Sequence, residues 1–443
     1  MWGGLRAVVR STEEGVLVRV LRRTVVVLLL TVLVALALAS PAFAATKRTT
    51  YVKGLPSATA RVYRAVSYSA AGTLTYAQSG KRYPLKYAYV KVYRYKSGKW
   101  SYLKRIKTNS KGQFKFTLGA GYGYQVKYAG NSTKKSSVSA KFRIYKPDPK
   151  NTVYAVDTYN NRVQVFNRDG KFLFKFGMTG SGKGQFKQPY SIAKDAVGNL
   201  YVTDSGNDRI QKFDSAGKFI RQIGSFGRLD GMLDNPEGIA VDTSGTAVYV
   251  VDMYNNRVQK FSSDGQYLTQ WGQSGSGNGQ FSSASQVSVD ATGNVYIVDS
   301  GNARVQKFDS DGNFLTKWGS RGSGDGQFGH GMYGAGWGIA ISPANVVYVV
   351  DYANHRVQSF DTTGTYLSQF GSAGSGNGQF ATACQVSLDA SNNIYVSDVV
   401  NCRVQKFDSA GNYLSQWGSN GSGNGQFMYS PQGLVALALR YGN

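Results

Sequence analysis

Short apolar segments separated by polar turns recur through the last two thirds of the chain. In one complete unit they are residues 236–242, 247–252, 257–261 and 267–271, which are rich in Val, Ile, Tyr and Phe. Clusters of Asp, Asn, Ser and Gly stand between them, which is typical of strands joined by turns. Residues 248–251 are apolar at every position, as expected for a small sheet covered on both faces. The pattern predicts four short strands per unit.

The unit is one of six, because the motif Asp-x-x-Asn-x-Arg-(Val/Ile)-Gln-x-Phe occurs six times. Successive motifs begin 47, 48, 47, 52 and 47 residues apart, and a period in this range indicates a repeat architecture. An all-β fold, a six-bladed β-propeller, is predicted, since radial stacking covers both faces of each small sheet and leaves only short edges. The charged residues of the motif are Asp157, Asp204, Asp252, Asp299, Asp351 and Asp398, with Arg162, Arg209, Arg257, Arg304, Arg356 and Arg403.

The two ends of the repeat array are expected to close the ring. The first unit begins directly with its second strand at residues 152–156. The opening strand that it lacks is matched near the C-terminus, where SPQGLVA at 430–436 corresponds to NPEGIAV at 235–241. We therefore expect the C-terminal strand to complete the first blade through main-chain hydrogen bonds.

Three phrases of the repeat resemble NHL repeats: PEGIAVD at residues 236–242, YVVDMYNNRVQKF at 249–261 and GSGNGQF at 275–281. The resemblance covers residues 150–443 in six copies and is specific for the fold. It implies functions that range from protein or RNA binding to peptide-lyase activity on the same ring, so the site must be argued from its own residues.

Charge divides the chain into three segments. The 443 residues include 51 Lys and Arg against 25 Asp and Glu, a net charge of +26. Residues 1–45 carry +3, residues 46–150 carry +23, and residues 151–443 are neutral. The predicted propeller, residues 152–443, is therefore neutral, whereas RNA-binding NHL proteins are expected to use a basic face.

Residues 1–44 are predicted to be a secretory signal peptide. Arg19, Arg22 and Arg23 precede an uncharged apolar run at 25–39, and a Ser-Pro pair and the small-x-small sequence ending at Ala44 follow. A membrane anchor is the alternative, but 15 residues at about 1.5 Å each are shorter than a hydrocarbon core of about 30 Å. Cleavage predicts a secreted protein, extracellular or associated with the cell envelope, with no transmembrane segment.

Residues 46–147 are predicted to form a small β-sandwich, and residues 148–151 a short linker to the propeller. Residues 46–150 contain 24 Lys and Arg, 14 Tyr and a single acid, Asp148. Residues 80–100, 111–114 and 128–131 resemble secreted bacterial Ig-like modules. So basic a surface is expected to attract an anionic envelope polymer or nucleic acid, with Tyr available for stacking. The alternative is that Tyr fills the sandwich and Lys keeps its edges soluble.

Residues shared by all six units are expected to build blades, and unshared residues are candidates for function. The motif and the connector Gly-Ser-Gly-x-Gly-Gln-Phe belong to the first class, since the connector does not lead from a strand into a helix as a phosphate-binding loop would. The connectors, the motif turns and the starts of the inner strands are expected on one face, the loop face. Its candidate ligand-binding residues are Tyr190, Glu237, Trp337, Gln432, Tyr159, Tyr254, Tyr352, His355 and His330. The alternative is that the tyrosines pack on neighbouring loops.

A binding protein is favoured over an enzyme. The two histidines, His330 and His355, are too few for the zinc site that a resemblance to peptide α-amidating lyases implies. Lactonase-like propellers imply Glu, Asp and Asn around a divalent ion, and Glu237 could begin such a site. We predict no metal and no cofactor, and a loop face that recognises a protein, peptide or glycan. A lyase or lactonase-like hydrolase, and nucleic-acid binding by the basic segment, are the alternatives.

The only cysteines, Cys384 and Cys402, both fall in the last complete unit. One begins the inner strand and the other follows the second strand. In a secreted protein this placement favours a disulfide within one blade.

Overall fold

In a computed structural model of the protein, the chain divides into two units, Met1–Pro147 and Asp148–Asn443. In the second unit the structure describes residues 152–329, 338–428 and 437–438. In the first it describes 50–53, 61–63, 67–78, 81–84, 87–97, 99–111, 113–119, 123–129, 137–138 and 142–145. No helix within these ranges is long and apolar enough to cross a membrane.

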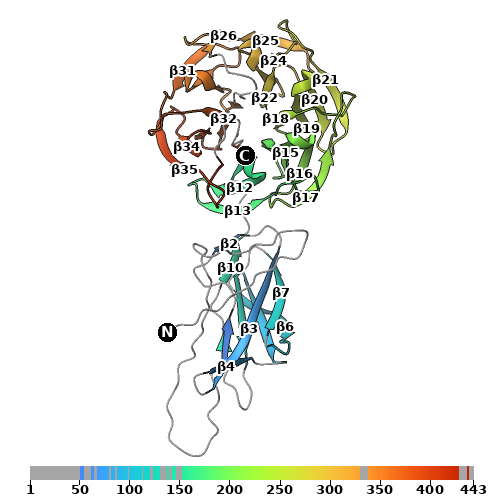
Figure 1. Cartoon of the computed structure of the whole chain (residues 1–443), viewed down its shortest axis with the longest axis vertical. Coiled ribbons are helices and arrows are strands. Elements are labelled where there is room, and N and C mark those ends of the chain that lie inside the picture. The colour runs from blue at the N-terminus through green and yellow to red at the C-terminus, as the bar shows by residue number, and fades with distance from the viewer. Residues whose placement is uncertain are drawn as a thin grey trace, which may run out of the picture. The chain divides into compact units, whose positions relative to one another are not determined.

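The second unit contains six four-stranded antiparallel sheets arranged around a common centre (Figure 1). Five of them follow the chain from inside to outside in the order first, second, third and fourth strand. The inner strands are β14 (Pro189–Lys194), β18 (Pro236–Val241), β22 (Ala284–Val289), β28 (Ile339–Ile341) and β32 (Ala383–Leu388). These begin blades 2 to 6, and the sheet that contains residues 152–176 is blade 1.

The second and third strands of each blade are joined by the motif, whose turn is a short 3-10 helix in blades 1 to 5. The second strands are β11 (Thr152–Asp157), β15 (Leu200–Asp204), β19 (Ala247–Asp252), β23 (Val295–Asp299), β29 (Val347–Asp351) and β33 (Ile394–Asp398). The turns are η2 (Thr158–Asn160), η3 (Ser205–Asn207), η4 (Met253–Asn255), η5 (Ser300–Asn302) and η6 (Tyr352–Asn354). The third strands are β12 (Arg162–Asn167), β16 (Arg209–Phe213), β20 (Arg257–Ser262), β24 (Arg304–Phe308), β30 (Arg356–Phe360) and β34 (Arg403–Phe407).

The fourth strands lie at the rim of the ring (Figure 1). They are β13 (Phe172–Phe176), β17 (Phe219–Ile223), β21 (Tyr267–Trp271), β25 (Phe314–Trp318), β31 (Tyr366–Phe370) and β35 (Tyr413–Trp417). A two-stranded parallel pair, β26 (Ser320–Arg321) and β27 (Gln327–Phe328), is formed within the connector after blade 4.

The C-terminal strand β36 (Leu437–Ala438) lies in blade 1. It pairs antiparallel with β11, with Ala438 opposite Tyr154 and Leu437 opposite Ala155. Blade 1 thus has the order β13-β12-β11-β36. The closing strand predicted at residues 430–436 lies outside the described residues.

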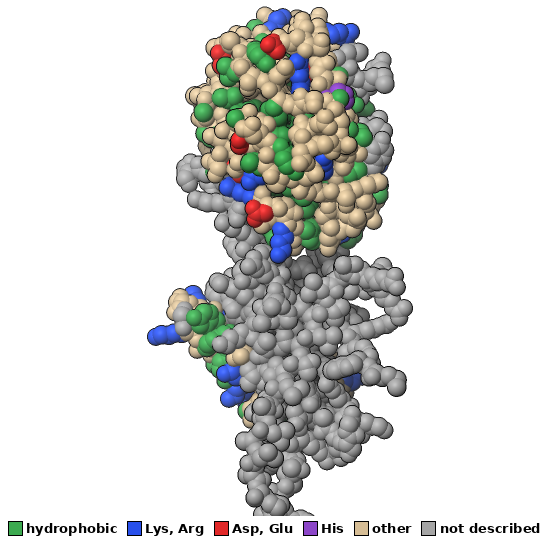
Figure 2. Space-filling view, turned by 90° about the vertical axis from the view of Figure 1, so that its left-hand side faces the viewer, with side chains coloured by type: hydrophobic (Ala, Val, Ile, Leu, Met, Phe, Trp, Pro, Cys, Tyr) green, Lys and Arg blue, Asp and Glu red, His purple; other side chains and the backbone are tan. Residues whose placement is uncertain are grey.

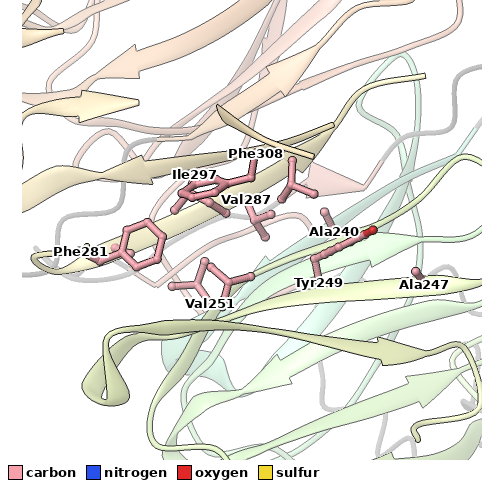
Figure 3. Packing of buried hydrophobic residues seen from close by; sticks show 11 residues of the cluster. Ala240, Ala247, Tyr249, Val251, Phe281, Val287, Ile297 and Phe308 are labelled. Carbon is pink, nitrogen blue, oxygen red and sulfur yellow. The ribbon is translucent and has the colours of Figure 1, made fainter. Parts of the chain in front are cut away.

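The core of the propeller lies between neighbouring blades. One cluster joins Tyr249 and Val251 of β19 to Ile297 of β23 and Phe308 of β24 (Figure 3). Phe281 of the connector is fully buried in this cluster, and its ring centroid lies 5.8 Å from that of Phe308. The second strands are buried at every position because sheets cover both of their faces.

The first unit contains two sheets within its described residues. One has the order β1-β3-β4, with β7 also paired to β3. The other has the order β2-β10-β8-β5-β6, with β9 also paired to β8. Their bounds are β1 (Thr50–Lys53), β2 (Arg61–Tyr63), β3 (Ser67–Gln78), β4 (Lys81–Pro84), β5 (Tyr89–Lys96), β6 (Lys99–Lys107), β7 (Gln113–Gly119), β8 (Gly123–Tyr128), β9 (Ser137–Val138) and β10 (Phe142–Tyr145).

Candidate functional site

The shared motif fastens each blade to the connector that arrives from the blade before it. In blade 3, Arg257 Nε donates to Asp252 Oδ2 at 2.7 Å, and Arg257 Nη2 donates to the carbonyl oxygens of Leu229 and Met232 at 3.0 and 2.8 Å. Asp252 Oδ1 accepts the backbone N–H of Asp234 at 2.7 Å. The Arg–Asp pairs of all six blades are formed at 2.6–3.0 Å and are nearly fully buried. Their polar atoms are occupied by structural contacts.

The same contacts join the last connector to blade 1. Arg162 Nη1 donates to the carbonyl oxygen of Ser422 at 2.7 Å, and Nη2 donates to that of Gly423 at 2.8 Å. The backbone N–H of Gly425 donates to Gln164 Oε1 at 2.9 Å. Residues separated by about 260 positions in the chain are therefore held together by side chains as well as by the β11–β36 pairing.

The structure places some of the predicted loop-face residues in the protein interior. Tyr190 is buried and packs in one cluster with Cys384 and Val399, and the half-buried Tyr352 contacts this cluster. Tyr190 and Tyr352 therefore pack against neighbouring side chains. Tyr159 and His355 are half-buried. Trp337, Gln432 and His330 lie outside the described residues.

His355 ends the η6 turn in the left-handed conformation, with φ of 55°. Its Nδ1 atom is buried without a hydrogen-bond partner. The described residues contain no group of three or more His, Cys, Asp or Glu side chains that could hold a metal ion.

Glu237 occupies the most unusual environment among the candidates. It is the only glutamate after residue 14, and it is 4% exposed at the start of β18. Asn235 Nδ2 lies 3.5 Å from its Oε1, while Oε2 is buried without a partner. Burial raises the pKa of Glu237 to about 8, although hydrogen bonds with Tyr190 and Asn235 act to lower it. At neutral pH the carboxyl group is therefore mostly protonated.

Other buried polar atoms on the inner strands also have no partner. Ser285 Oγ and Gln286 Nε2 lie on β22, and Gln385 Nε2 lies on β32. A Cβ atom on Gly238 of β18 would come within 2.6 Å of Gln286 Cα, so β18 and β22 approach closely beside Glu237. We call Glu237, Ser285 and Gln286 the inner-strand cluster. An unpaired buried polar group costs about 1–3 kcal/mol, which a ligand with matching polar groups would offset.

The predicted disulfide between Cys384 and Cys402 is wrong, because both are free and buried. Ala383 pairs with Asp398, and Asp398 pairs on its other side with Arg403. The two cysteines therefore flank the second strand on opposite sides. Two strand spacings amount to about 9.6 Å, whereas a disulfide requires Cα atoms within about 7 Å. The prediction assumed that Cys402 lies beside the inner strand, whereas it lies beside the third strand.

The connector from blade 2 to blade 3 contains exposed apolar residues that the sequence analysis missed. Phe226 and Leu229 are 69% and 70% exposed, and Tyr254 of the η4 turn is 65% exposed. Asn255 Nδ2 donates to the carbonyl oxygen of Gly227 at 3.0 Å, which ties this turn to the connector. We call Phe226, Leu229 and Tyr254 the blade-3 patch.

The signal for this patch is a departure from the repeat. Residues 227–233 read GRLDGML where other connectors read GSGxGQF. Phe226 forms a β-bridge with Leu233, the final residue of its connector. In the other five connectors the residues at the position of Phe226 are Thr179, Ser274, Arg321, Ala373 and Asn420. The residues at the position of Leu229 elsewhere are Gly182, Gly277, Gly324, Gly376 and Gly423. An apolar substitution at two polar or small positions marks this connector as different.

Comparison with known proteins identifies the family. The family described as 6-bladed beta-propeller matches residues 143–225, 239–319 and 340–417, which together make up more than half of the chain. The chain belongs to this family. Membership confirms the all-β, six-bladed propeller.

Solved structures show similarity at low sequence identity. Virginiamycin B lyase from Staphylococcus aureus is 13% identical with a TM-score of 0.43, covering 61% of this chain and 81% of that chain. A protein of unknown function from Bacteroides caccae is 13% identical with a TM-score of 0.46, covering 60% and 93%. A chain of the nidogen/laminin complex is 16% identical with a TM-score of 0.45, covering 65% and 97%. No curated protein matches significantly. These similarities carry no argument about function.

Proposed function

We propose that the protein is a secreted, non-enzymatic binding protein. Its propeller, of the NHL type and closed by the C-terminal strand, recognises a protein or peptide segment on its loop face. Its first unit, an Ig-like module, contacts an anionic polymer of the cell envelope. The single observation that carries the proposal is the blade-3 patch, where exposed apolar side chains replace the polar and glycine residues of the repeat.

The chemistry of the patch favours a protein or peptide over a glycan. Burying a Leu or Phe side chain contributes about 1.5–3 kcal/mol, and Phe226 and Leu229 keep more than two thirds of their surface exposed. Neither side chain can form a hydrogen bond with sugar hydroxyls. Those hydroxyls would lose their hydrogen bonds to water without gaining new ones. Large aromatic residues in such patches are typical anchors of protein partners.

The inner-strand cluster adds specificity to this surface. Glu237 follows the patch connector directly in sequence, at the start of β18. A protonated carboxyl can both donate and accept a hydrogen bond, and Gln286 adds an unpaired amide donor on the next inner strand. A neutral polar group of the ligand, such as a backbone amide, matches these protein groups better than a carboxylate of the ligand would.

Closure of the ring is supported by the contacts of blade 1. Arg162 bonds to residues 422–426, and β36 pairs with β11. A ring closed in this way holds the connectors in fixed positions. The patch is then presented on a rigid surface, which lowers the entropy cost of binding.

A second candidate is a lyase or hydrolase, and one observation favours it. A buried carboxyl with a pKa of about 8 is the type of group found in active sites. The described hydrogen-bond partners of Glu237 are Tyr190 and Asn235, and this single carboxyl is the one feature that points to catalysis, whereas the blade-3 patch offers three exposed side chains to a partner. We therefore rank this candidate below binding.

The proposal is tested with the full chain and a displayed library of random peptides. Peptides selected on the wild-type protein are measured against a variant with Phe226→Ser, Leu229→Ser and Tyr254→Ser. The matched control carries Leu268→Ser, Leu315→Ser and Leu367→Ser, because these leucines are half-exposed on the fourth strands. We expect at least tenfold weaker binding for the patch variant and unchanged binding for the control.

Three results would overturn the proposal. Equal losses in both variants would indicate non-specific adhesion to apolar surface. Selection of glycans but no peptides from parallel arrays would assign the loop face to sugars. Turnover of an array component that the Glu237→Gln substitution abolishes would establish the enzyme instead.

A further inference from the structure

One face of the second sheet in the first unit carries both cations and aromatic rings. The first half of strand β5 alternates, with Val90 and Val92 fully buried on one face and Tyr89 and Lys91 exposed on the other. The neighbouring strands β6 and β8 continue this face, with Arg105 exposed and Lys127 half-buried. In the space-filling view, Lys and Arg side chains lie among hydrophobic ones in the described part of this unit (Figure 2).

Three cations stand side by side across this face. Lys91 of β5 lies directly opposite Arg105 of β6 and directly opposite Lys127 of β8. Like charges in directly opposed positions destabilise a sheet. Residues 46–147 contain no acid at all, so no carboxylate within this segment can neutralise the row. We call Lys91, Arg105 and Lys127 the cation row.

Aromatic rings hold two of these cations in place. The Arg105 guanidinium lies 4.2 Å above the centroid of the Tyr89 ring, and Lys127 Nζ lies 4.8 Å from the centroid of the Tyr93 ring. Tyr95 packs against Trp100, with ring centroids 5.1 Å apart. Cation–π contact orders the charged groups but leaves their outer N–H groups available.

This arrangement selects among anionic partners. Bases of a single-stranded nucleic acid would need free ring faces on which to stack, and cations already cover one face of Tyr89 and of Tyr93, the two rings in contact with the row. The row spans three strands, or about 9.6 Å, so one small anion cannot contact all three side chains. The guanidinium fork of Arg105 matches the paired oxygens of a phosphate group.

We propose that the cation row binds a linear phosphodiester polymer without bases, recognised through its repeating charge. This deepens the proposed contact of the first unit with an anionic envelope polymer and rests on it. The polymer neutralises a row of like charges that the sheet otherwise holds at a cost in stability. The row is thus a binding site that is strained until it is occupied.

The test compares two variants of the full chain with the same change in net charge. The row variant carries Lys91→Gln, Arg105→Gln and Lys127→Gln. The control carries Lys96→Gln, Lys99→Gln and Lys111→Gln, which are exposed positions of the same unit. The probes are poly(glycerol phosphate), oligo(dT) and polygalacturonate, titrated at several salt concentrations. Thermal unfolding without polymer is measured in parallel.

We expect the wild type to bind poly(glycerol phosphate) most tightly. Three phosphate contacts at a slope of about 0.7 each predict roughly 20-fold weaker binding between 50 and 200 mM salt. The row variant should lose at least tenfold in affinity at low salt and most of the salt slope, and the control less than threefold. Without polymer the row variant should unfold at a higher temperature than the wild type, and the control should not.

Each contrary result has a distinct meaning. Equal losses in both variants would keep the proposed polymer contact but overturn the cation row as its site. Tighter binding of oligo(dT) or polygalacturonate would overturn the phosphodiester assignment. No binding to any probe would overturn both this inference and the envelope contact, and it would leave peptide binding by the blade-3 patch untouched.

Discussion

Replacing Glu237 by glutamine should change how the stability of the protein depends on pH. Burial raises the pKa of this carboxyl from 4.5 to about 8. The folded protein therefore keeps a proton that the unfolded chain releases near pH 4.5. The full stability is present below that pH, and it falls as the pH rises toward 8, because the unfolded state then ionises and the folded state does not.

The magnitude follows from the size of the shift. A change of one pKa unit corresponds to about 1.36 kcal/mol, so ionisation of Glu237 should cost the folded state on the order of 5 kcal/mol above pH 8. Relaxation and water entry would reduce this value. Glutamine has nearly the same shape and no charge, so the Glu237→Gln variant should be free of this loss.

Urea unfolding of both proteins at pH 5, 7 and 9 provides the measurement. The stability of Glu237→Gln relative to the wild type should rise by about 3–5 kcal/mol between pH 5 and pH 9. Asp408→Asn serves as the control, because hydrogen bonds from Asn412 lower the pKa of exposed Asp408 and place its titration below this range. Parallel pH profiles for Glu237→Gln and the wild type would refute the assignment of a protonated, buried Glu237.

Three further predictions concern the propeller. Phe281→Ala should destabilise the protein by about 3–5 kcal/mol, because it empties a fully buried site. The control is Phe226→Ala, because Phe226 lies in a connector too but is exposed. It should change the free energy of unfolding, measured for both variants by urea titration, by less than about 0.5 kcal/mol. Deletion of residues 429–443 should lower the Tm by more than about 5 °C if the C-terminal strand closes the ring, and an unchanged Tm would contradict closure. In the folded protein Cys384 and Cys402 should resist a thiol reagent at pH 8, because burial raises the pKa of both thiols. Both should react after unfolding, and reaction of either thiol in the folded protein would contradict the prediction.

The sequence contained enough information to predict the blades. The strands predicted at residues 247–252 and 267–271 coincide with β19 and β21, and the one predicted at 257–261 is one residue shorter than β20. This accuracy has a physical reason, because every unit must solve the same packing problem with the same turn. Six copies in one chain make the solution visible without any other sequence.

The sequence could not show which unshared residues reach the surface. Tyr190 and Tyr254 look equivalent as aromatic residues on the loop face, yet the first is buried and the second is exposed. Whether a loop side chain turns inward depends on residues of another blade, here on Cys384 and Val399 of blade 6, which lie about 200 residues further along the chain. The disulfide failed for a related reason, since strand order alone does not tell which side of a strand the turn residue Cys402 occupies.

The way in which the blades are fastened explains why one connector can differ from the others. Arg257 Nη2 bonds to the main-chain oxygens of Leu229 and Met232, as Arg304 Nη2 bonds to those of Gly277 and Gln280 at 2.8 and 2.9 Å. The contact is made to the backbone, so it does not depend on the side chains of the connector.

Backbone conformation sets the remaining limit on that variation. Gly227 and Gly231 have φ of 150° and 77°, and glycine is kept at both positions in the divergent connector. The glycine at the position of Leu229 does not have a positive φ in the other connectors. A Cβ atom there would meet the connector glutamine within 3.0 Å, and in this connector Met232 takes the place of that glutamine, so a side chain is tolerated. Apolar groups can therefore be placed on this connector without weakening the blade, and the ring can acquire a binding surface at one blade while the other five continue to hold it in shape.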